Sequence, residues 1–185
     1  MIASRIQKQI VNLGIRDKRL AAKAEARLIR FGRRATSQLI KACDDSNPHV
    51  RLRTAWALAI IGDPKSFETV VRLCNDPDDE VAYDTRIALG LSGDSRALDV
   101  LLGLLGEKAE ERDSAPMGIQ RMNLPLSKLQ EFLASAKPEV RSAGLYLLLS
   151  NSEPGAIDHA KKLLEDVNPS VSAQAADVVA CLENP

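Results

Sequence analysis

The sequence predicts an all-α protein built from stacked helix pairs, and three observations support this. The thirty residues that begin at Asn47 are echoed 31 positions later, and another copy begins at Lys137. Such a period indicates repeated units that bury their apolar faces only against their neighbours. Within each copy apolar residues recur at helical spacing, and only 3% of the 185 residues are aromatic, which favours an aliphatic helical core. We expect a right-handed α-solenoid of about five helix pairs with capping half-units, or about twelve helices.

The copy at residues 47–77 shows how one unit is built. Asn47 is a suitable N-cap, and Pro48 occupies the first helical position, where its missing N–H costs nothing. Gly62 then ends the first helix, and Asp63 caps the second. Because the turns are short, the paired helices must run antiparallel. The first helix has one apolar stripe, formed by Val50, Thr54, Ala57, Leu58 and Ile61.

The other units are less regular but follow the same plan. In the first complete unit we predict an inward stripe at Leu20, Ala24 and Leu28. A later unit has Pro116 and Gly118 in its first helix, so we expect that helix to be broken or kinked there. The expected divisions of one solenoid domain, 1–185, are a half-unit at 1–14, units at about 17–46, 47–77, 78–106, 107–136 and 137–167, and a half-unit at 168–185.

Composition restricts the classes of function. The formal net charge is zero and the pI is near 6.7, so nothing global indicates a nucleic acid or an anionic membrane. No apolar run approaches the ~18–20 residues of a membrane span, and the first residues lack the apolar core of a secretory signal. Cys43 and Cys74 lie 31 residues apart on apolar faces, as expected of buried residues in a reducing compartment. We expect a cytoplasmic protein without a membrane contact.

The repeat pattern resembles that of a known family. The segments NPHVRLRTAWALAIIGD and KPEVRSAGLYLLL each combine a proline, a Val-Arg pair and alanines or leucines at helical spacing. They resemble HEAT repeats of the short, PBS-lyase-like type, and the resemblance covers roughly residues 17–182. It implies HEAT-like helix pairs but no single function, because similar repeats occur in bilin-lyase subunits, an iron hydroxylase acting on deoxyhypusine, DNA glycosylases and adaptors without chemistry.

The sequence argues against the hydroxylase chemistry and gives little support to a nucleic-acid enzyme. The hydroxylase holds iron with repeated His-Glu dipeptides, whereas neither His49 nor His159 is followed by Glu. No Ser-His-Asp set, zinc-peptidase motif or P-loop is present. A glycosylase would need a basic groove with aromatic side chains and a carboxylate, but Trp56 shares its repeat position with Ile87 and Tyr146. We therefore predict no catalytic, cofactor-binding or metal-binding residues.

The neutral total hides a marked charge asymmetry. Residues 1–41 carry eleven Lys or Arg and two acidic residues, a net charge of +9, whereas residues 42–113 carry eight against fifteen, a net charge of −7. This basic end is either a solvated cap, which a solenoid needs for solubility, or a docking surface for an acidic partner or, less readily, for a phosphate backbone. Its densest part includes Arg27, Arg30, Arg33 and Arg34.

A second set of cations recurs at the start of the second helices. Lys65 and Arg96 are 31 residues apart, at the position that Arg34 has in the first complete unit. Cations there oppose the helix dipole, so a compensating charge is expected. They either form a charge ladder between repeats with Asp63 and Asp94 or line a basic rim on the concave groove.

A row of large residues lies away from the apolar stripe. At 100° per residue, Trp56 points about 140° from the stripe of its helix. Tyr83 and Tyr146 belong to the same row in later units. The row either packs between neighbouring first helices or forms an exposed apolar strip, which would indicate an interface.

These observations favour a non-enzymatic scaffold or adaptor that binds a protein partner along its curved surface through shape and charge. One alternative is an auxiliary subunit resembling the E/F-type phycobilin lyases, whose repeats these resemble most. A second alternative is a nucleic-acid binder, or a relative of the HEAT-like DNA glycosylases, that uses the basic N-terminal end.

Overall fold

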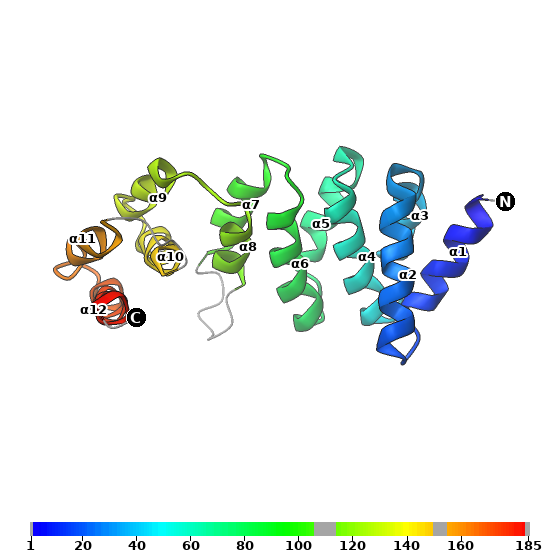
Figure 1. The fold of residues 1–185 in the computed structure, drawn as a ribbon, viewed down its shortest axis with the longest axis horizontal. Coiled ribbons are helices and arrows are strands. Elements are labelled where there is room, and N and C mark those ends of the chain that lie inside the picture. The colour runs from blue at the N-terminus through cyan, green and yellow to red at the C-terminus, as the bar shows by residue number, and fades with distance from the viewer. Residues whose placement is uncertain (1, 106–113, 150–154, 184–185) are drawn as a thin grey trace. The chain divides into compact units, whose positions relative to one another are not determined.

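The computed structural model describes residues 2–105, 114–149 and 155–183 (Figure 1). These residues form twelve α-helices and contain no β-strand, so the predicted all-α repeat fold is confirmed. The chain divides into two compact units, Met1–Leu101 and Leu102–Pro185. That one solenoid domain runs through both of them stays a prediction.

The first unit is a stack of antiparallel helix pairs. The long first helices lie side by side, with α2 against α4 and α4 against α6, while the short second helices α3 and α5 each pack on the first helix that follows them (Figure 1). Helix α1 lies against α2 and covers the end of the stack. The helices are α1 (Ile2–Leu13), α2 (Lys18–Phe31), α3 (Thr36–Ala42), α4 (Pro48–Ile61), α5 (Phe67–Leu73), α6 (Asp79–Leu91) and α7 (Ala97–Gly103).

The core of this unit is aliphatic, as predicted. Val50, Thr54, Ala57 and Leu58 of the predicted stripe are all buried. Further side chains that are almost completely buried are Ile6, Leu13, Leu28, Leu39, Leu73, Val81, Leu89 and Leu101.

The predicted inward stripe of α2 was wrong at one position. Leu20 is 49% exposed, and Ala21 takes the inward place beside Ala24 and Leu28. These three residues are spaced by three and four, so they share one face, and Leu20 lies about 100° away from Ala21. The small alanines allow α2 to approach its neighbours closely.

The helix ends follow the predicted capping chemistry. The side chain of Asn47 accepts a hydrogen bond of 3.0 Å from the backbone N–H of His49. Asp63 accepts one of 3.2 Å from Lys65, so it caps the short 3-10 helix Pro64–Ser66 that leads into α5 and not α5 itself. Gly62 ends α4 in the left-handed region, with φ of +61°. A side chain at Gly62 would also meet the carbonyl oxygen of Ser92 at 3.2 Å.

The second unit has the same construction. Helix α10 packs on both α9 and α12, and α11 packs on α12. A β-carbon at Gly144 of α10 would lie 2.9 Å from the Leu133 side chain, so these helices approach closely because Gly144 has no side chain. The helices are α8 (Ala115–Arg121), α9 (Leu126–Leu133), α10 (Pro138–Leu148), α11 (Ala156–Lys161) and α12 (Pro169–Glu183).

The helix around Pro116 is short rather than kinked. Helix α8 begins at Ala115, which places Pro116 in the first turn, where proline is tolerated. Gly118 is buried within this seven-residue helix. The earlier part of the unit predicted at 107–136 lies outside the described residues.

Candidate partner-binding surface

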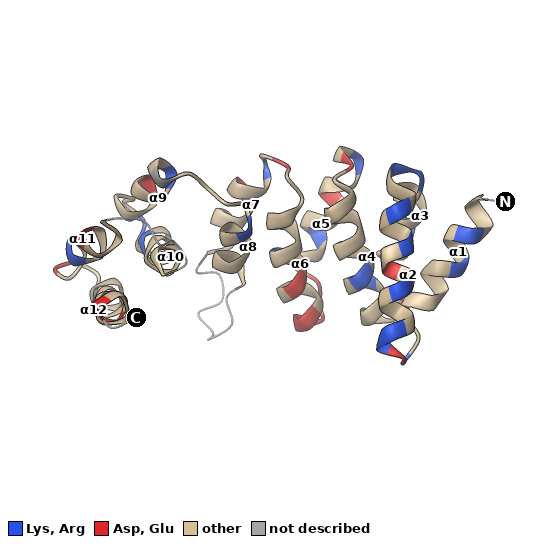
Figure 2. Ribbon diagram, in the orientation of Figure 1, with Lys and Arg blue, Asp and Glu red and all other residues tan. Residues whose placement is uncertain are grey.

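Basic residues line one side of α2. Arg19, Lys23, Arg27 and Arg30 are spaced by four, four and three residues, which places them in one row along the helix, and all four are exposed. We call these four residues the basic stripe. Figure 2 shows Lys and Arg concentrated on α1, on α2 and in the turn between α2 and α3, and acidic residues at the beginning of α6.

The two acidic residues of this segment do not neutralise the stripe. Asp17 caps α2 and accepts hydrogen bonds from the backbone N–H groups of Arg19, at 2.8 Å, and Leu20, at 3.2 Å. Glu25 binds Arg53 of α4 at 3.0 Å. Burial raises the pKa of Glu25, and Arg53 opposes that shift. Among the described residues, no ion pair joins a stripe cation to a carboxylate.

The basic surface continues into the turn after α2. The short 3-10 helix Gly32–Arg34 carries Arg33 and Arg34, both exposed. Within the row, the guanidinium of Arg27 donates a hydrogen bond of 3.4 Å to Gln9 of α1. The four arginines predicted from the sequence therefore share one end of the first unit, and their role in binding stays a prediction.

Arg96 lies on the surface but contacts other residues of the chain. It binds Asp94 of its own turn at 2.8 Å and Glu68 of the preceding repeat at 3.5 Å, and its guanidinium lies 3.8 Å from the centre of the Phe67 ring. The hydrogen bonds between them raise the pKa of Arg96 and lower that of Asp94. At this point Glu68, rather than Asp63, links the two repeats.

Lys65 has a different environment from Arg96. Its side chain is exposed, and it forms no ion pair with another described residue. The hydrogen bond from its backbone N–H is the main cause of the lowered pKa of Asp63, to which the charge of Arg33 adds. Lys65 therefore remains a candidate for contact with a partner, whereas Arg96 has a structural role that accounts for its position.

The row through Trp56 is largely packed between helices. Trp56 on α4 and Tyr83 on α6 are half-buried, and Ile87, the residue equivalent to Trp56, is only 7% exposed. Helices α4 and α6 are in direct contact, which explains this burial. Tyr146 is half-buried on α10 of the second unit. The described residues thus form no continuous exposed strip in the first unit, and a contact of this row with a partner stays a prediction.

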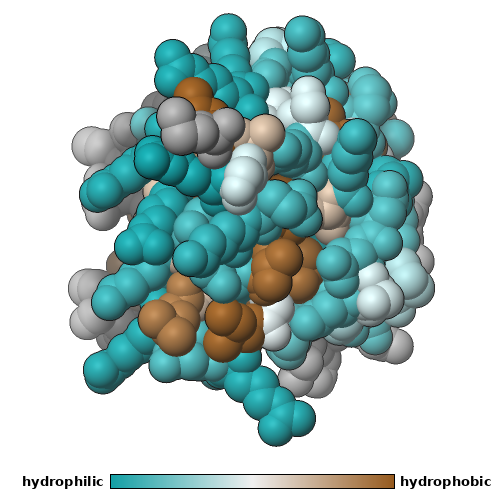
Figure 3. Space-filling view, turned by 90° about the vertical axis from the view of Figure 1, so that its right-hand side faces the viewer, coloured by the Kyte–Doolittle hydropathy of each residue, from teal (hydrophilic) through white to brown (hydrophobic). Residues whose placement is uncertain are grey.

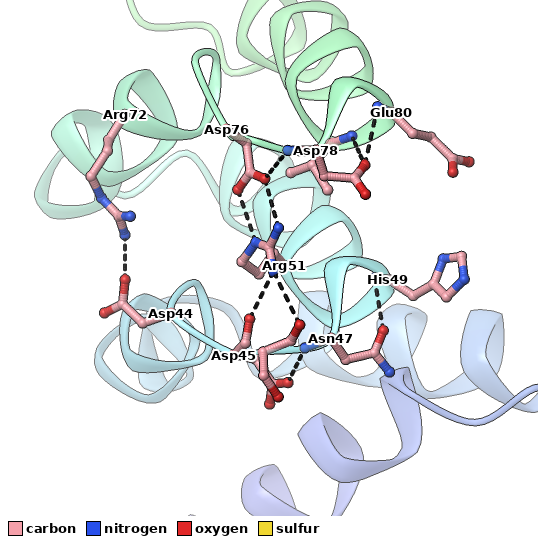
Figure 4. Close-up of polar contacts among 11 residues, drawn as sticks. Asp44, Asp45, Asn47, His49, Arg51, Arg72, Asp76, Asp78 and Glu80 are labelled. Atoms are coloured by element: carbon pink, nitrogen blue, oxygen red, sulfur yellow. Dashed lines mark hydrogen bonds and ion pairs between the residues drawn. The ribbon is translucent and has the colours of Figure 1, made fainter.

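The sequence reasoning missed an arginine that joins two loops. The guanidinium of Arg51 donates two hydrogen bonds, of 2.9 and 2.7 Å, to the carboxylate of Asp76 and one of 3.0 Å to the backbone carbonyl of Asp45 (Figure 4). The Asp76 side chain is 3% exposed and also accepts a hydrogen bond from the backbone N–H of Asp78. Arg51 thereby connects the loop before α4 to the loop after α5.

The same arrangement recurs in the second unit. Arg141 donates hydrogen bonds of 2.7 and 2.6 Å to Asp166 and one of 2.8 Å to the carbonyl of Ser135. In both repeats an arginine follows a valine at the start of the first helix, and the aspartate comes 25 residues later. This spacing of 25 residues, which recurs in both repeats, could have identified the two ion pairs from the sequence.

The described residues also contain two buried thiols and two cavities. The described residues contain no group of three or more His, Cys, Asp or Glu placed to hold a metal ion. Burial raises the pKa of Cys43 and of Cys74 to about 12, so both thiols stay protonated.

Within the described part of the chain, no helix has the length and apolar character to cross a bilayer. One cavity of about 280 Å³ is lined by Gly62, Asp63, Phe67, Ser92 and Asp94, among others, and one of about 230 Å³ by Ile119, Arg121, Asn123, Leu129 and Leu147, among others.

Comparison with known proteins gives a family match. A profile of HEAT repeats matches residues 16–90 and, in a second register, residues 36–119. No curated protein sequence matches the chain.

Solved repeat proteins are similar along most of the chain. A designed armadillo repeat protein in complex with a (KR)4 peptide is 19% identical, with 94% of this chain and 98% of that one covered and a TM-score of 0.43. A chain of the complex of CpcE and CpcF of phycocyanin lyase from Nostoc sp. PCC7120 is 22% identical, with 95% and 98% covered and a TM-score of 0.46. Human deoxyhypusine hydroxylase is 17% identical, with 98% and 86% covered and a TM-score of 0.33. Similarities at this level carry no information about a ligand.

Proposed function

The chain belongs to the HEAT-repeat family, and we propose that it is a non-enzymatic adaptor that binds an acidic protein partner through the N-terminal end of its helix stack. The observation that carries this proposal is the basic stripe, whose exposed cations form no ion pair within the described part of the chain. The end of a helix stack must be polar to stay soluble, but charges of both signs would meet that need. A single sign favours a partner of the opposite charge. The proposal places the protein in the cytoplasm, where the thiols of Cys43 and Cys74 would stay reduced.

The stripe is unfavourable for α2 itself. Arg19, Lys23 and Arg27 are like charges at spacings of four, and each such pair destabilises a helix by about 0.2–0.5 kcal/mol. Lys18 and Arg19 also lie in the first turn, where positive charge opposes the helix dipole. Carboxylates of a bound partner would offset both penalties, which supports a role in binding over a role in stability.

A reversal of charge tests the proposal directly. The triple variant Arg27→Glu, Arg30→Glu and Arg34→Glu changes exposed residues only, so the fold should be kept. The wild-type protein and the variant would be used as bait in nuclease-treated extracts of the source organism. We expect proteins held by the wild type to be lost by the variant, and to leave the wild type as added salt screens the charges.

A matched control distinguishes the effect of this surface on capture from the effect of net charge. The variant Arg121→Glu, Lys137→Glu and Lys162→Glu reverses three exposed cations of the second unit and changes the net charge by the same amount. It should capture the same proteins as the wild type. Equal capture by both triple variants would refute the proposed surface. Capture seen only in extracts without nuclease treatment would favour a phosphate backbone as the ligand.

A further inference from the structure

Three large aliphatic side chains lie exposed beside the basic stripe. Val11 of α1 is 65% exposed, Ile15 in the following turn is 40% exposed and Leu20 of α2 is 49% exposed. All three fall within ten consecutive residues. Figure 3, which looks onto the N-terminal end of the first unit, shows hydrophobic side chains close together in a largely hydrophilic face. We call these three residues the aliphatic patch.

The patch does not belong to the core. Helix α1 buries Ile6, Ile10 and Leu13 in one row. At 100° per residue, Val11 points about 130° away from the centre of that row. Single exposed aliphatic residues are common on proteins, but a group of them on one face indicates an interface.

Cations lie next to two residues of the patch in the sequence. Arg16, Lys18 and Arg19 lie between Ile15 and Leu20 in the sequence, and all three are exposed. Leu20 also neighbours the stripe, because it is the next residue after its first member. The end of the unit therefore offers apolar and positively charged groups on one continuous segment.

We propose that this end binds an acidic amphipathic helix, whose aliphatic side chains contact the aliphatic patch while its carboxylates pair with the basic stripe. The inference rests on the proposed function and adds the chemistry of the partner. The stripe runs about 17 Å along α2, since eleven residues rise 1.5 Å each. A partner helix of about three turns covers this length and presents apolar residues at spacings of three and four.

Other occupants match the surface less well. Single-stranded nucleic acids bind through aromatic stacking platforms, but the first aromatic residue of the chain is Phe31. A second copy would bring together two ends of net charge +9, which repel each other. An anionic lipid surface shares the preference for basic and apolar groups, so it enters the test as a competing outcome.

The test uses two labelled synthetic peptides of equal charge. The first is an acidic helix with leucines along one face, and the second has serine in place of every leucine. Affinity would be measured by fluorescence anisotropy. We expect the wild-type protein to bind the leucine peptide at least tenfold more tightly, which corresponds to about 1.4 kcal/mol.

Protein variants then assign that preference to the patch. The variant Val11→Ser, Ile15→Ser and Leu20→Ser should bind both peptides with the weaker affinity. The matched control Ile60→Ser and Leu91→Ser alters exposed aliphatic residues of α4 and α6, 47% and 41% exposed, and should keep the preference. Circular dichroism would verify that each variant remains folded.

The outcomes distinguish this inference from the proposed function. Equal affinity for the two peptides would overturn the aliphatic contact and leave a purely electrostatic protein-binding surface intact. Failure of both peptides to bind would overturn the inference, and binding of duplex DNA or of phosphatidylserine vesicles in their place would overturn the proposed function as well. Retention of the leucine preference by the patch variant would place the contact elsewhere on the protein.

Discussion

The second repeat and the N-terminal end use arginine in different ways. In the second repeat, Arg51 of α4 binds Asp76 at 2.7 Å, and Arg53 of the same helix binds Glu25 at 3.0 Å. The cations of the basic stripe on α2 have no such partner among the described residues. Arginines with a carboxylate in reach hold neighbouring helices and loops together, whereas the unpaired cations of the stripe remain available to another molecule.

The paired arginines are also less exposed than the cations of the stripe. The Arg51 side chain is 14% exposed and that of Arg53 is 24% exposed, whereas the residues of the stripe are all exposed. Because water screens an ion pair more strongly as its exposure rises, the effect of replacing each residue on stability should decline in that order.

The largest effect is expected for Arg51→Ala. This change leaves the buried Asp76 carboxylate without its cation, which should lower the free energy of unfolding by roughly 2–4 kcal/mol. Urea unfolding followed by circular dichroism measures this. Arg51→Lys should recover only part of the loss, because lysine cannot form the paired hydrogen bonds. A loss below about 0.5 kcal/mol would contradict a stabilising role for the Arg51–Asp76 pair.

Acid should weaken the same contacts without a mutation. The hydrogen bonds from Arg141 lower the pKa of Asp166 below 3.8, and those from Arg51 outweigh burial and lower the pKa of Asp76. A carboxyl group whose pKa is lower in the folded state stabilises the fold at any pH above its pKa in the unfolded state. This stabilisation is lost as the pH falls through the pKa of the folded state. Urea unfolding should therefore show a free energy that declines below about pH 4. Asp166→Asn should flatten this decline, and an unchanged slope would contradict the assignment.

A smaller effect is expected for Arg53→Ala. The pair with Glu25 is partly exposed, so its loss should lower the free energy of unfolding by about 1 kcal/mol. The pKa of Glu25, which burial already raises, should rise further when Arg53 no longer opposes that shift. Thermal unfolding and NMR titration of the carboxyl group give the two quantities. A cost equal to that of Arg51→Ala would contradict the dependence on burial.

The smallest change, and one of opposite sign, is expected for Lys23→Glu. A glutamate at this position forms favourable pairs with Arg19 and Arg27, so it should raise the free energy of unfolding by roughly 0.5 kcal/mol. Differential scanning calorimetry would show a higher Tm, while affinity for an acidic peptide should fall. A loss of stability would show that the stripe supports the fold instead of a partner.

Local sequence features predicted much of the fold. Asn47 and Asp63 were identified as caps because such residues bond to backbone groups two positions away, and both do so in the structure. The inward face of α2 was predicted less well, since Leu20 is a better core residue than Ala21 on hydrophobicity alone. Close packing of α2 against its neighbours favoured the smaller residue on that face.

The candidate surface was predicted by composition but not in its detail. The arginines of the N-terminal segment were identified from their density. The structure places Arg27 and Arg30 in one exposed row on α2 and Arg33 and Arg34 in the turn that follows it. The role of Arg51 was not predicted, although Asp76 lies at a spacing that Arg141 and its own aspartate repeat. Pairing at that distance depends on how closely two loops approach, which sequence spacing does not report.

The sequence by itself determined the repeat, the helix ends of the unit at 47–77 and the separation of charge along the chain, because these follow from residue types and their spacing. The tertiary structure decided which charges are neutralised, that Ile87 is buried between α4 and α6, and that Val11, Ile15 and Leu20 remain exposed. These properties depend on distances between residues of different helices, and only the packing of one repeat on the next establishes those distances.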